Sequence, residues 1–196
     1  CGAARGQGRR FAAPAAGVLA MALRSLGPGA RVLELGGGSG AVAEVTLKRL
    51  LQLDALPDRY AILEPSADLR ERQRDHLART LTPPVFDLVE WLDRPFEDDW
   101  DGVLFANEVI DALPTPRFTL RDGEVFEEYV AMDGDGRFVR TDRPADALLA
   151  AAVRHVEHAL GTPFADGYRS ELLPQLPYWL QAVAGGLRSG AMLFID

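Results

Sequence analysis

The sequence predicts an α/β fold with a mostly parallel, doubly wound sheet and a β-containing insertion. Three observations support this prediction. Short apolar runs alternate with helix-like segments in the first half of the chain, a glycine-rich turn follows the first run, and polar residues follow each run directly. Strands that alternate with helices are typical of parallel sheets. A length of 196 residues suits one domain that carries an insertion.

Composition and charge narrow the classes of function. The formal net charge of -8 disfavours nucleic acid as a main partner, because phosphate binding needs a basic face, and it suits a cationic partner. Cys1 is the only cysteine, so no disulfide can form within the chain and a reducing compartment is expected. The sequence contains no apolar run long enough to span a membrane.

Two segments precede the first predicted strand. The Gly- and Arg-rich stretch 1–10 is expected to be a loop, either a frayed end or a segment that covers a ligand. The Ala- and Leu-rich stretch 12–26 predicts a helix that ends at Gly27 and packs beside the strand.

The stretch 31–40 joins the end of a buried strand to a glycine turn and a helix that starts at Ala41. Glycine turns tightly and brings no Cβ near a ligand, and a helix N-terminus offers unpaired N–H groups. Gly36, Gly38 and Ala41 match the dinucleotide fingerprint G-x-G-x-x-A. A glycine turn that binds no ligand is another interpretation. The pattern E-x-G-x-G-x-G also resembles the first motif of S-adenosylmethionine (SAM) methyltransferases, here Glu34, Gly36, Gly38 and Gly40.

The second predicted strand, 60–64, ends at Glu64, and a helix follows from Ser66. Ligands of open α/β sheets bind at the carboxyl ends of the strands. At that edge Glu64 can accept hydrogen bonds from both hydroxyl groups of a ribose, and the alternative is a solvated carboxylate beside a helix N-terminus. The helix is expected to present a solvated polar face formed by Arg70, Arg72, Gln73 and Arg74.

Polar residues also follow the third and fourth predicted strands, 89–92 and 101–107. Trp91 is expected in the core, and Asp93 is either an adenine contact or a loop carboxylate. After the fourth strand comes a cluster of two carboxylates and an amide that suits a cationic or amine-bearing acceptor. On a helical turn its two acids, three residues apart, would face one way, and the alternative is local capping. The cluster comprises Asn107, Glu108 and Asp111.

The segment 105–114, Phe-Ala-Asn-Glu-Val-Ile-Asp-Ala-Leu-Pro, resembles the signature A-N-E-x-x-D-A-x-P of the MidA family of SAM-dependent methyltransferases. This family includes a mitochondrial complex I assembly factor. Segments 60–69, 167–171 and 193–196 are also similar, so the resemblance runs from about residue 12 to the end. Family members have a longer N-terminal segment and continue beyond Asp196, so either the protein is short or the chain is part of it.

The resemblance implies a Rossmann-like SAM-dependent methyltransferase that N-methylates a protein, with arginine as the acceptor residue and a respiratory complex subunit as a partner. It implies a cytoplasmic location in a bacterium, or the mitochondrial matrix in a eukaryote. The implied catalytic residues are Asn107, Glu108 and Asp111. The implied cofactor contacts are Glu34, Gly36, Gly38, Gly40, Glu64, Pro65, Ser66, Asp93 and Asn107.

Residues 112–190 are too many for an ordinary crossover and are expected to form an insertion that recognises the acceptor. Residues 1–111 and 191–196 would form the SAM-binding core. Strands are predicted at 117–120, 125–131 and 137–141, and helices at 145–160 and 172–187, the second one interrupted at Pro174 and Pro177. An excess of acid in this region suits a basic peptide, and comprises Glu124, Glu127, Glu128 and Glu171.

No metal site is expected. The turn at 133–136 resembles a calcium loop superficially but lacks the ligand count and the closing Glu, and His155 and His158 lack a third ligand. Two other functions stay open beside methyl transfer: a SAM-fold binding or assembly protein without turnover, and an NAD-dependent oxidoreductase. Detection of methylated product with labelled SAM distinguishes the first alternative from methyl transfer. A comparison of SAM and NAD binding distinguishes the second.

Overall fold

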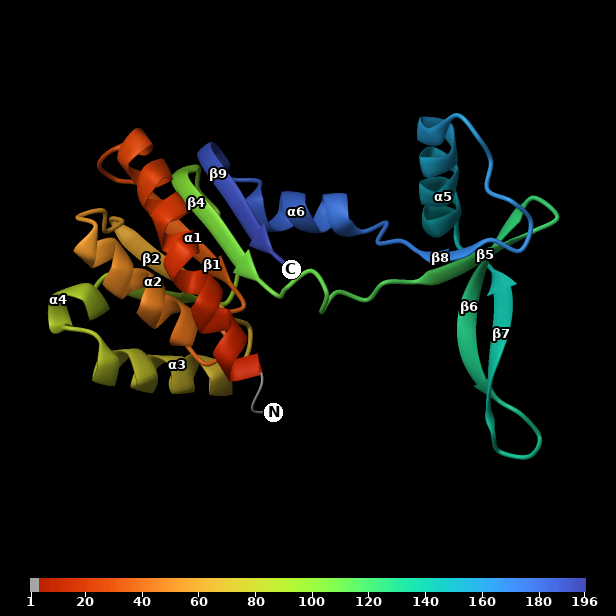
Figure 1. Ribbon diagram of the computed structural model, residues 1–196, viewed down its shortest axis with the longest axis horizontal. Helices are drawn as coiled ribbons and strands as arrows, with labels where there is room; N and C mark the ends of the chain where they lie inside the picture. Colours follow the sequence, from red (N-terminus) through yellow and green to blue (C-terminus); the bar gives the residue numbers. More distant parts are fainter. Residues whose placement is uncertain (1–3) are drawn as a thin grey trace. The chain divides into compact units, whose positions relative to one another are not determined.

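A computed structural model describes residues 4–196, which form two compact units (Figure 1). Unit 1 comprises the described residues up to Asp111 together with Leu180–Asp196, and unit 2 comprises Ala112–Trp179. The boundary expected at residue 190 therefore falls inside unit 1, within its last strand. In this described part of the chain no helix is both long and apolar enough to cross a membrane.

Unit 1 is built on a five-stranded parallel sheet with the order β3-β2-β1-β4-β9, which confirms the predicted α/β fold class (Figure 1). Its strands are β1 (Arg31–Leu35), β2 (Arg59–Leu63), β3 (Val89–Leu92), β4 (Trp100–Asn107) and β9 (Leu187–Ile195). The last strand begins earlier than its predicted start at 191. Residues 187–190 are included because they pair with the first residues of β4.

The helices of this part of the chain are α1 (Ala4–Leu26), α2 (Ala41–Gln52), α3 (Ala67–Thr80), α4 (Pro83–Phe86) and α6 (Leu176–Ala184). The loop expected at 1–10 is wrong from Ala4 onward, because Ala, Arg and Gln favour a helix enough to carry it through two glycines. Residues 1–3 lie outside the described part. Helix α6 is shorter than the predicted 172–187, since Pro174 precedes it.

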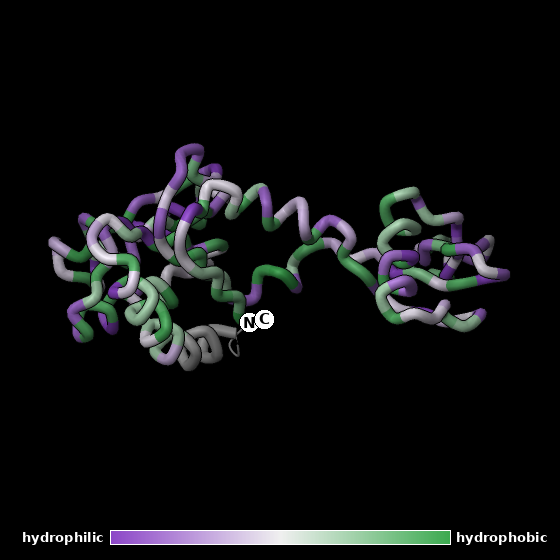
Figure 2. Tube along the Cα trace, turned by 90° about the horizontal axis from the view of Figure 1, so that it is seen from above, coloured by the Kyte–Doolittle hydropathy of each residue, from purple (hydrophilic) through white to green (hydrophobic). Residues whose placement is uncertain are grey.

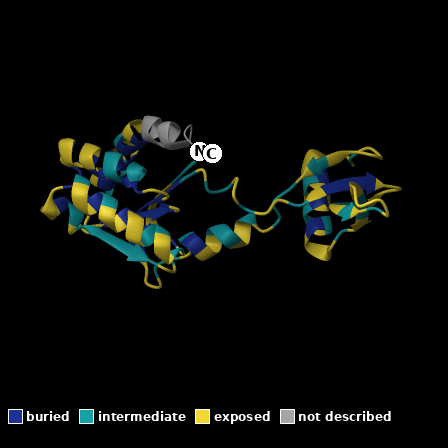
Figure 3. Cartoon of the chain, turned by 90° about the horizontal axis from the view of Figure 1, so that it is seen from below, coloured by how far each residue is buried: buried dark blue, intermediate teal, exposed yellow. Residues whose placement is uncertain are grey.

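The core of unit 1 lies between helices α1 and α2 and one face of the sheet. Alternate residues of each strand point to that face, among them Val32, Tyr60 and Phe105, and they pack with Leu19 of α1 and Leu47 of α2. Strands β1, β2 and β4 and the inner sides of these helices are mostly buried (Figure 3). This packing fixes the ends of β1, β2 and β4, from which the candidate site is built.

Unit 2 is a four-stranded antiparallel sheet with the order β7-β6-β5-β8. Its elements are β5 (Arg117–Arg121), β6 (Glu124–Met132), β7 (Phe138–Pro144), α5 (Ala147–Leu160) and β8 (Arg169–Glu171). The three predicted strands and the helix are present, and the three-residue, largely charged β8 was not predicted. One face of the sheet packs on α5 through Phe118, Leu120 and Val153. In each unit hydrophobic and hydrophilic stretches alternate along the chain (Figure 2).

Candidate functional site

The turn between β1 and α2 takes a left-handed backbone conformation at alternate residues. The φ angles of Gly36, Gly38 and Gly40 are 64°, 51° and 79°. Residues with a Cβ rarely adopt such angles, so the spacing of these glycines follows from the path of the backbone. The Gly36 N–H donates to the carbonyl oxygen of Leu63 at 3.1 Å and ties the turn to the end of β2.

Glycine is required at position 37 for a different reason: there is no space for a side chain. A Cβ at this position would lie 2.7 Å from Cγ2 of Ile62 and 3.2 Å from Nε2 of Gln73. Both neighbours are buried, so neither can move away cheaply. The glycine turn is therefore pressed against β2 and α3.

Glu64 follows β2 directly and is 5% exposed. Its Oε1 accepts a hydrogen bond from the Ser66 N–H at 3.0 Å, and its Oε2 accepts one from Gln73 Nε2 at 3.3 Å. Arg70 donates to the Glu64 carbonyl oxygen at 2.7 Å. A carboxylate offers roughly four acceptor positions, so this one keeps capacity for two hydroxyl groups.

Pro65 and Ser66 connect Glu64 to helix α3. The Pro65 carbonyl oxygen accepts from Arg70 at 3.2 Å, and Ser66 Oγ caps the helix by accepting from the Leu69 N–H at 3.4 Å. Both residues thus hold the turn in shape, and a direct cofactor contact by either stays a prediction.

Gln73 does not lie on the expected solvated face of α3, because its side chain is wholly buried. Nε2 donates to the Gly38 carbonyl oxygen at 3.0 Å, and Oε1 accepts from the Trp91 indole at 3.0 Å. Trp91 packs against the core, as expected. Gln73 precedes the buried Leu77 by four residues, and this helical spacing was the available signal in the sequence.

Glu34 lies within the core face of unit 1 and is 2% exposed. Its Oε2 accepts a hydrogen bond from the Tyr60 hydroxyl at 2.8 Å. Burial raises the pKa of Glu34 to about 7, and the Tyr60 hydrogen bond opposes this rise. Burial and the neighbouring Glu34 also raise the pKa of Tyr60. The structure thus gives Glu34 an internal partner, and its contact with a cofactor stays a prediction.

Residues 107–111 form an acceptor-side loop at the end of β4. The helical turn expected here is wrong: Glu108 is in the left-handed region at φ 51°, and bends and a turn follow it. Its N–H donates to the Ile195 carbonyl oxygen at 2.8 Å, which continues the pairing with β9 and prevents a helix from starting. The side chains of Glu108 and Asp111 are exposed, and Asn107 is half-buried.

Asp196 anchors this loop, a role that the sequence alone did not reveal. Its carboxylate accepts hydrogen bonds from the N–H groups of Ile110 at 2.8 Å and Asp111 at 3.2 Å. The loop also meets the glycine turn, since a Cβ on Gly36 would lie 3.2 Å from Cγ2 of Val109. The two elements are therefore neighbours at one edge of the sheet.

Strand order places the other predicted residues at the same edge. Strands β3, β2, β1 and β4 are adjacent and parallel, so the residues that follow them share the carboxyl edge. These residues are the exposed Asp93, the buried Glu64, the glycine turn from Gly36 and Asn107. The arrangement offers a buried acid, a backbone turn free of Cβ atoms and an exposed acidic loop.

Unit 2 contains a separate cavity of about 520 Å³. Its apolar lining comes mainly from prolines and from Leu148 and Leu149, and its acidic lining from Glu127, Glu128 and Asp146. Arg117 is the basic group of this lining. The cavity is thus amphipathic, with an excess of carboxylates.

Comparisons with known proteins identify the family of the chain. A family model described as "Putative S-adenosyl-L-methionine-dependent methyltransferase" matches residues 16–196. A COG1565 superfamily member from Burkholderia thailandensis, bound to S-adenosyl-homocysteine, is 34% identical with a TM-score of 0.79, over 96% of this chain and 46% of that one. An uncharacterized COG1565 superfamily protein from the same organism is 33% identical with a TM-score of 0.79, over 96% and 48%. The chain spans about half the length of these relatives. A search of the curated proteins found no match.

Proposed function

Because the chain belongs to a family of SAM-dependent methyltransferases, we propose that it binds SAM at the carboxyl edge of unit 1 and transfers the methyl group to a nitrogen of a protein. The observation that carries this proposal is the buried Glu64 carboxylate beside three left-handed glycines. The family match replaces the dinucleotide interpretation of Gly36, Gly38 and Ala41. The signature at 105–114 supports arginine as the acceptor residue and a respiratory complex subunit as the partner, in a bacterial cytoplasm or a mitochondrial matrix.

The residues present fit this cofactor. Glu64 accepts hydrogen bonds from the ribose hydroxyl groups with the capacity that Ser66 and Gln73 leave free. The turn at 36–40 lets the ligand approach the backbone closely, because the exposed Gly36 and Gly38 carry no Cβ. Asp93 contributes an acceptor for the adenine amino group. When bound, SAM supplies an electrophilic methyl group on a sulfonium.

The acceptor-side loop provides the groups that orient the nitrogen. Glu108 and Asp111 would accept hydrogen bonds from its N–H groups, and their charge would stabilise the cation. One of the two carboxylates would accept the proton that the nitrogen loses in exchange for the methyl group. Asn107 adds an amide at the end of β4. Asp196 holds the loop through two backbone N–H groups, so the backbone that carries the carboxylates is tied to the end of β9.

Methyl transfer is tested with radiolabelled SAM and a pool of arginine-rich peptides. We expect Glu108→Gln to bind S-adenosyl-homocysteine normally and to lose roughly 10²–10³-fold in turnover, because one oriented charge is removed while shape is kept. Glu97→Gln, an exposed residue paired with Arg94, is the matched control. Unchanged turnover in Glu108→Gln would leave Glu108 with only its backbone role. Normal ligand binding with no product from the unaltered chain would favour an assembly protein.

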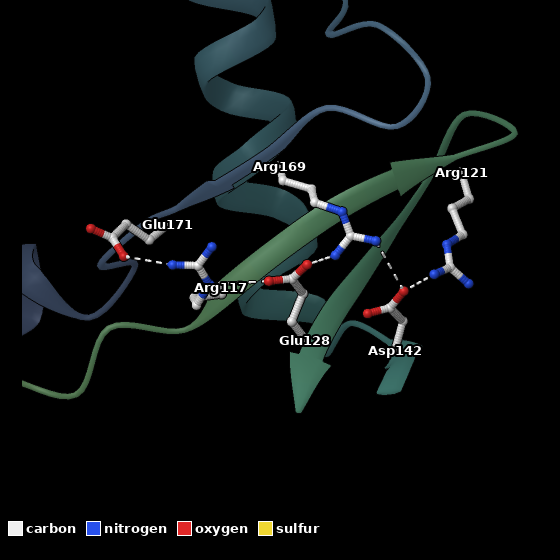
Figure 4. Close-up of polar contacts among 6 residues, drawn as sticks. All are labelled: Arg117, Arg121, Glu128, Asp142, Arg169 and Glu171. Carbon is white, nitrogen blue, oxygen red and sulfur yellow. Dashed lines mark hydrogen bonds and ion pairs between the residues drawn. The ribbon is translucent and has the colours of Figure 1, made fainter. Parts of the chain in front are cut away.

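The cavity of unit 2 supports acceptor recognition by the insertion. Two of the four glutamates expected to steer a basic peptide are engaged by arginines (Figure 4). Glu128 pairs with Arg169 and lies 3.0 Å from Arg117, and Glu171 lies 3.7 Å from Arg117. Glu127 instead accepts from the Tyr129 hydroxyl at 2.6 Å and lines the cavity. Glu127 is therefore the glutamate best placed to meet a basic side chain.

Glu127→Gln tests this recognition. We expect it to leave S-adenosyl-homocysteine affinity alone and to weaken binding of an arginine-rich peptide by roughly 3- to 10-fold, more at low salt. Glu124→Gln, an exposed residue of the same strand outside the cavity lining, is the matched control. A fall in S-adenosyl-homocysteine affinity with normal peptide binding would assign unit 2 to the cofactor site.

A further inference from the structure

We propose that Gln73 is the positioning residue of the SAM site, acting through the glycine turn and Glu64 without touching the ligand. The inference rests on the proposed function. The side chain of Gln73 is wholly buried, and its carboxamide joins Gly38 in the β1–α2 turn, Glu64 after β2 and Trp91 in β3. One amide thus connects three segments that converge on the site.

Trp91 fixes the orientation of this amide. An indole N–H can only donate, so the Gln73 atom 3.0 Å from it must be the oxygen. The amide nitrogen then faces two acceptors, the Gly38 carbonyl oxygen at 3.0 Å and the Glu64 carboxylate at 3.3 Å. A reversed amide would place donor against donor and acceptor against acceptor. Trp91 therefore decides which end of Gln73 faces the site.

Gln73 sets the path of the glycine turn. Because carbonyl and following N–H point in opposite directions across a trans peptide, the bond from Gln73 to the Gly38 carbonyl turns the Ser39 N–H away from α3. Gly38 and Ser39 are both exposed. A Cβ on Gly37 would lie 3.2 Å from Gln73 Nε2, and one on Gly40 would lie 3.4 Å from Gln73 Cα. The turn therefore meets Gln73 at Gly37, Gly38 and Gly40.

Gln73 also holds the Glu64 carboxylate. It donates to one oxygen while the Ser66 N–H donates to the other, so both oxygens have a fixed position. At 5% exposure this carboxylate depends on such donors, since burying an unpaired charge is costly. Removal of the Gln73 donor frees the carboxylate to rotate and frees the turn at the same time.

The first test is calorimetry of S-adenosyl-homocysteine binding, with the unfolding temperature measured separately without ligand. We expect Gln73→Met, which keeps the length of the side chain, to weaken binding by roughly 10- to 100-fold in folded protein. Trp91→Phe removes only the indole donor and should weaken it by roughly 2- to 10-fold. Failure of the unaltered chain to bind contradicts the proposed function itself. Normal affinity in both folded variants overturns the positioning role alone.

A pH profile of Gln73→Glu separates positioning from mere structural support. The substitution places a second carboxyl beside Glu64, and two such groups share a proton. In its protonated form the new carboxyl has one O–H, which restores the hydrogen bond to Glu64 but not the second one to the Gly38 carbonyl oxygen. The affinity of this variant relative to the unaltered chain should therefore recover as the pH falls from about 8 to about 5. A relative affinity that does not change with pH would overturn the proposal even if Gln73→Met fails to fold.

Discussion

The two units accommodate their buried carboxylates in opposite ways. Unit 1 surrounds Glu34 and Glu64 with uncharged donors, a tyrosine hydroxyl, an amide and a backbone N–H. Unit 2 places the Glu128 and Asp142 side chains, 3% and 5% exposed, beneath arginines that are 40–51% exposed. Unit 1 is thus sensitive to the protonation of single groups, whereas unit 2 spreads charge over neighbouring strands.

The two units also differ in what else the partners of the buried carboxylates do. In unit 2 the charged network and the apolar contacts to α5 come from alternate residues of β5, as Arg117 and Phe118 illustrate. In unit 1 the groups that satisfy buried polar atoms, such as Gln73, also shape the candidate site. A change in unit 1 should therefore affect folding and binding together.

The largest effect should come from closing the space between β1 and β4. A Cβ on Gly102 would overlap the carbonyl oxygen of Arg31, its partner in the parallel sheet. We expect Gly102→Ala to lower the free energy of unfolding by about 4 kcal/mol. Gly134, in a turn of unit 2 with open space around it, is the matched control, and Gly134→Ala should cost under about 0.5 kcal/mol. Similar urea midpoints for Gly102→Ala and Gly134→Ala would contradict the expected difference between the two positions.

Protonation of Glu34 should be the next largest effect. The pKa of Glu34 is about 7 in the folded chain against an ordinary 4.5. The stability that its protonated form contributes is therefore fully present below pH 4.5 and is lost as the pH rises through 7. The unfolding free energy should fall by on the order of 3 kcal/mol over this range. Glu34→Gln keeps an acceptor for Tyr60 and should remove most of the slope. Urea unfolding at several pH values measures both chains, and identical slopes would contradict the assignment.

The charged network of unit 2 should give a smaller, local effect. Glu128→Gln removes the charge shared by Arg117 and Arg169 and should lower the stability of strands β5 to β8 by about 1–2 kcal/mol. Asp68→Asn breaks an ion pair with Arg72 in which both side chains are about two-thirds exposed, and should change nothing measurable. Hydrogen exchange measures the local stability of each unit separately. Equal changes in hydrogen-exchange protection in the two variants would contradict the view that the buried Glu128 contributes more to stability than the exposed Asp68.

Local patterns predicted most of the parallel sheet. The strands β1 to β4 lie near their expected positions. They were predictable because apolar runs form them and nearby glycines and prolines mark where they end. The signature at 105–114 pointed to SAM-dependent methyltransferases, and the match over 16–196 confirms that family. The predicted helical turn at 108–111 is wrong, because the hydrogen bond from the Glu108 N–H to the Ile195 carbonyl oxygen sets the backbone there.

Long-range contacts account for the residues that the sequence did not reveal. Gln73 sits among arginines in a charged helix, where its spacing from Leu77 was the one local signal, and its bonds to Gly38 and Trp91 depend on distant segments. Asp196 meets Ile110, which lies 86 positions earlier in the sequence. The burial of Glu34 beside Tyr60 likewise depends on the register of β1 and β2. None of these pairings has a local pattern in the sequence.

Calorimetric titration of S-adenosyl-homocysteine into the unaltered chain and Glu64→Ala tests the central claim most directly, that a buried acid at the carboxyl edge holds the nucleoside. The account predicts binding by the unaltered chain and roughly 10- to 100-fold weaker binding by Glu64→Ala, because charged hydrogen bonds are left unmade. NAD should give no heat of binding to either chain. Equal affinities of the two chains for S-adenosyl-homocysteine would contradict the account.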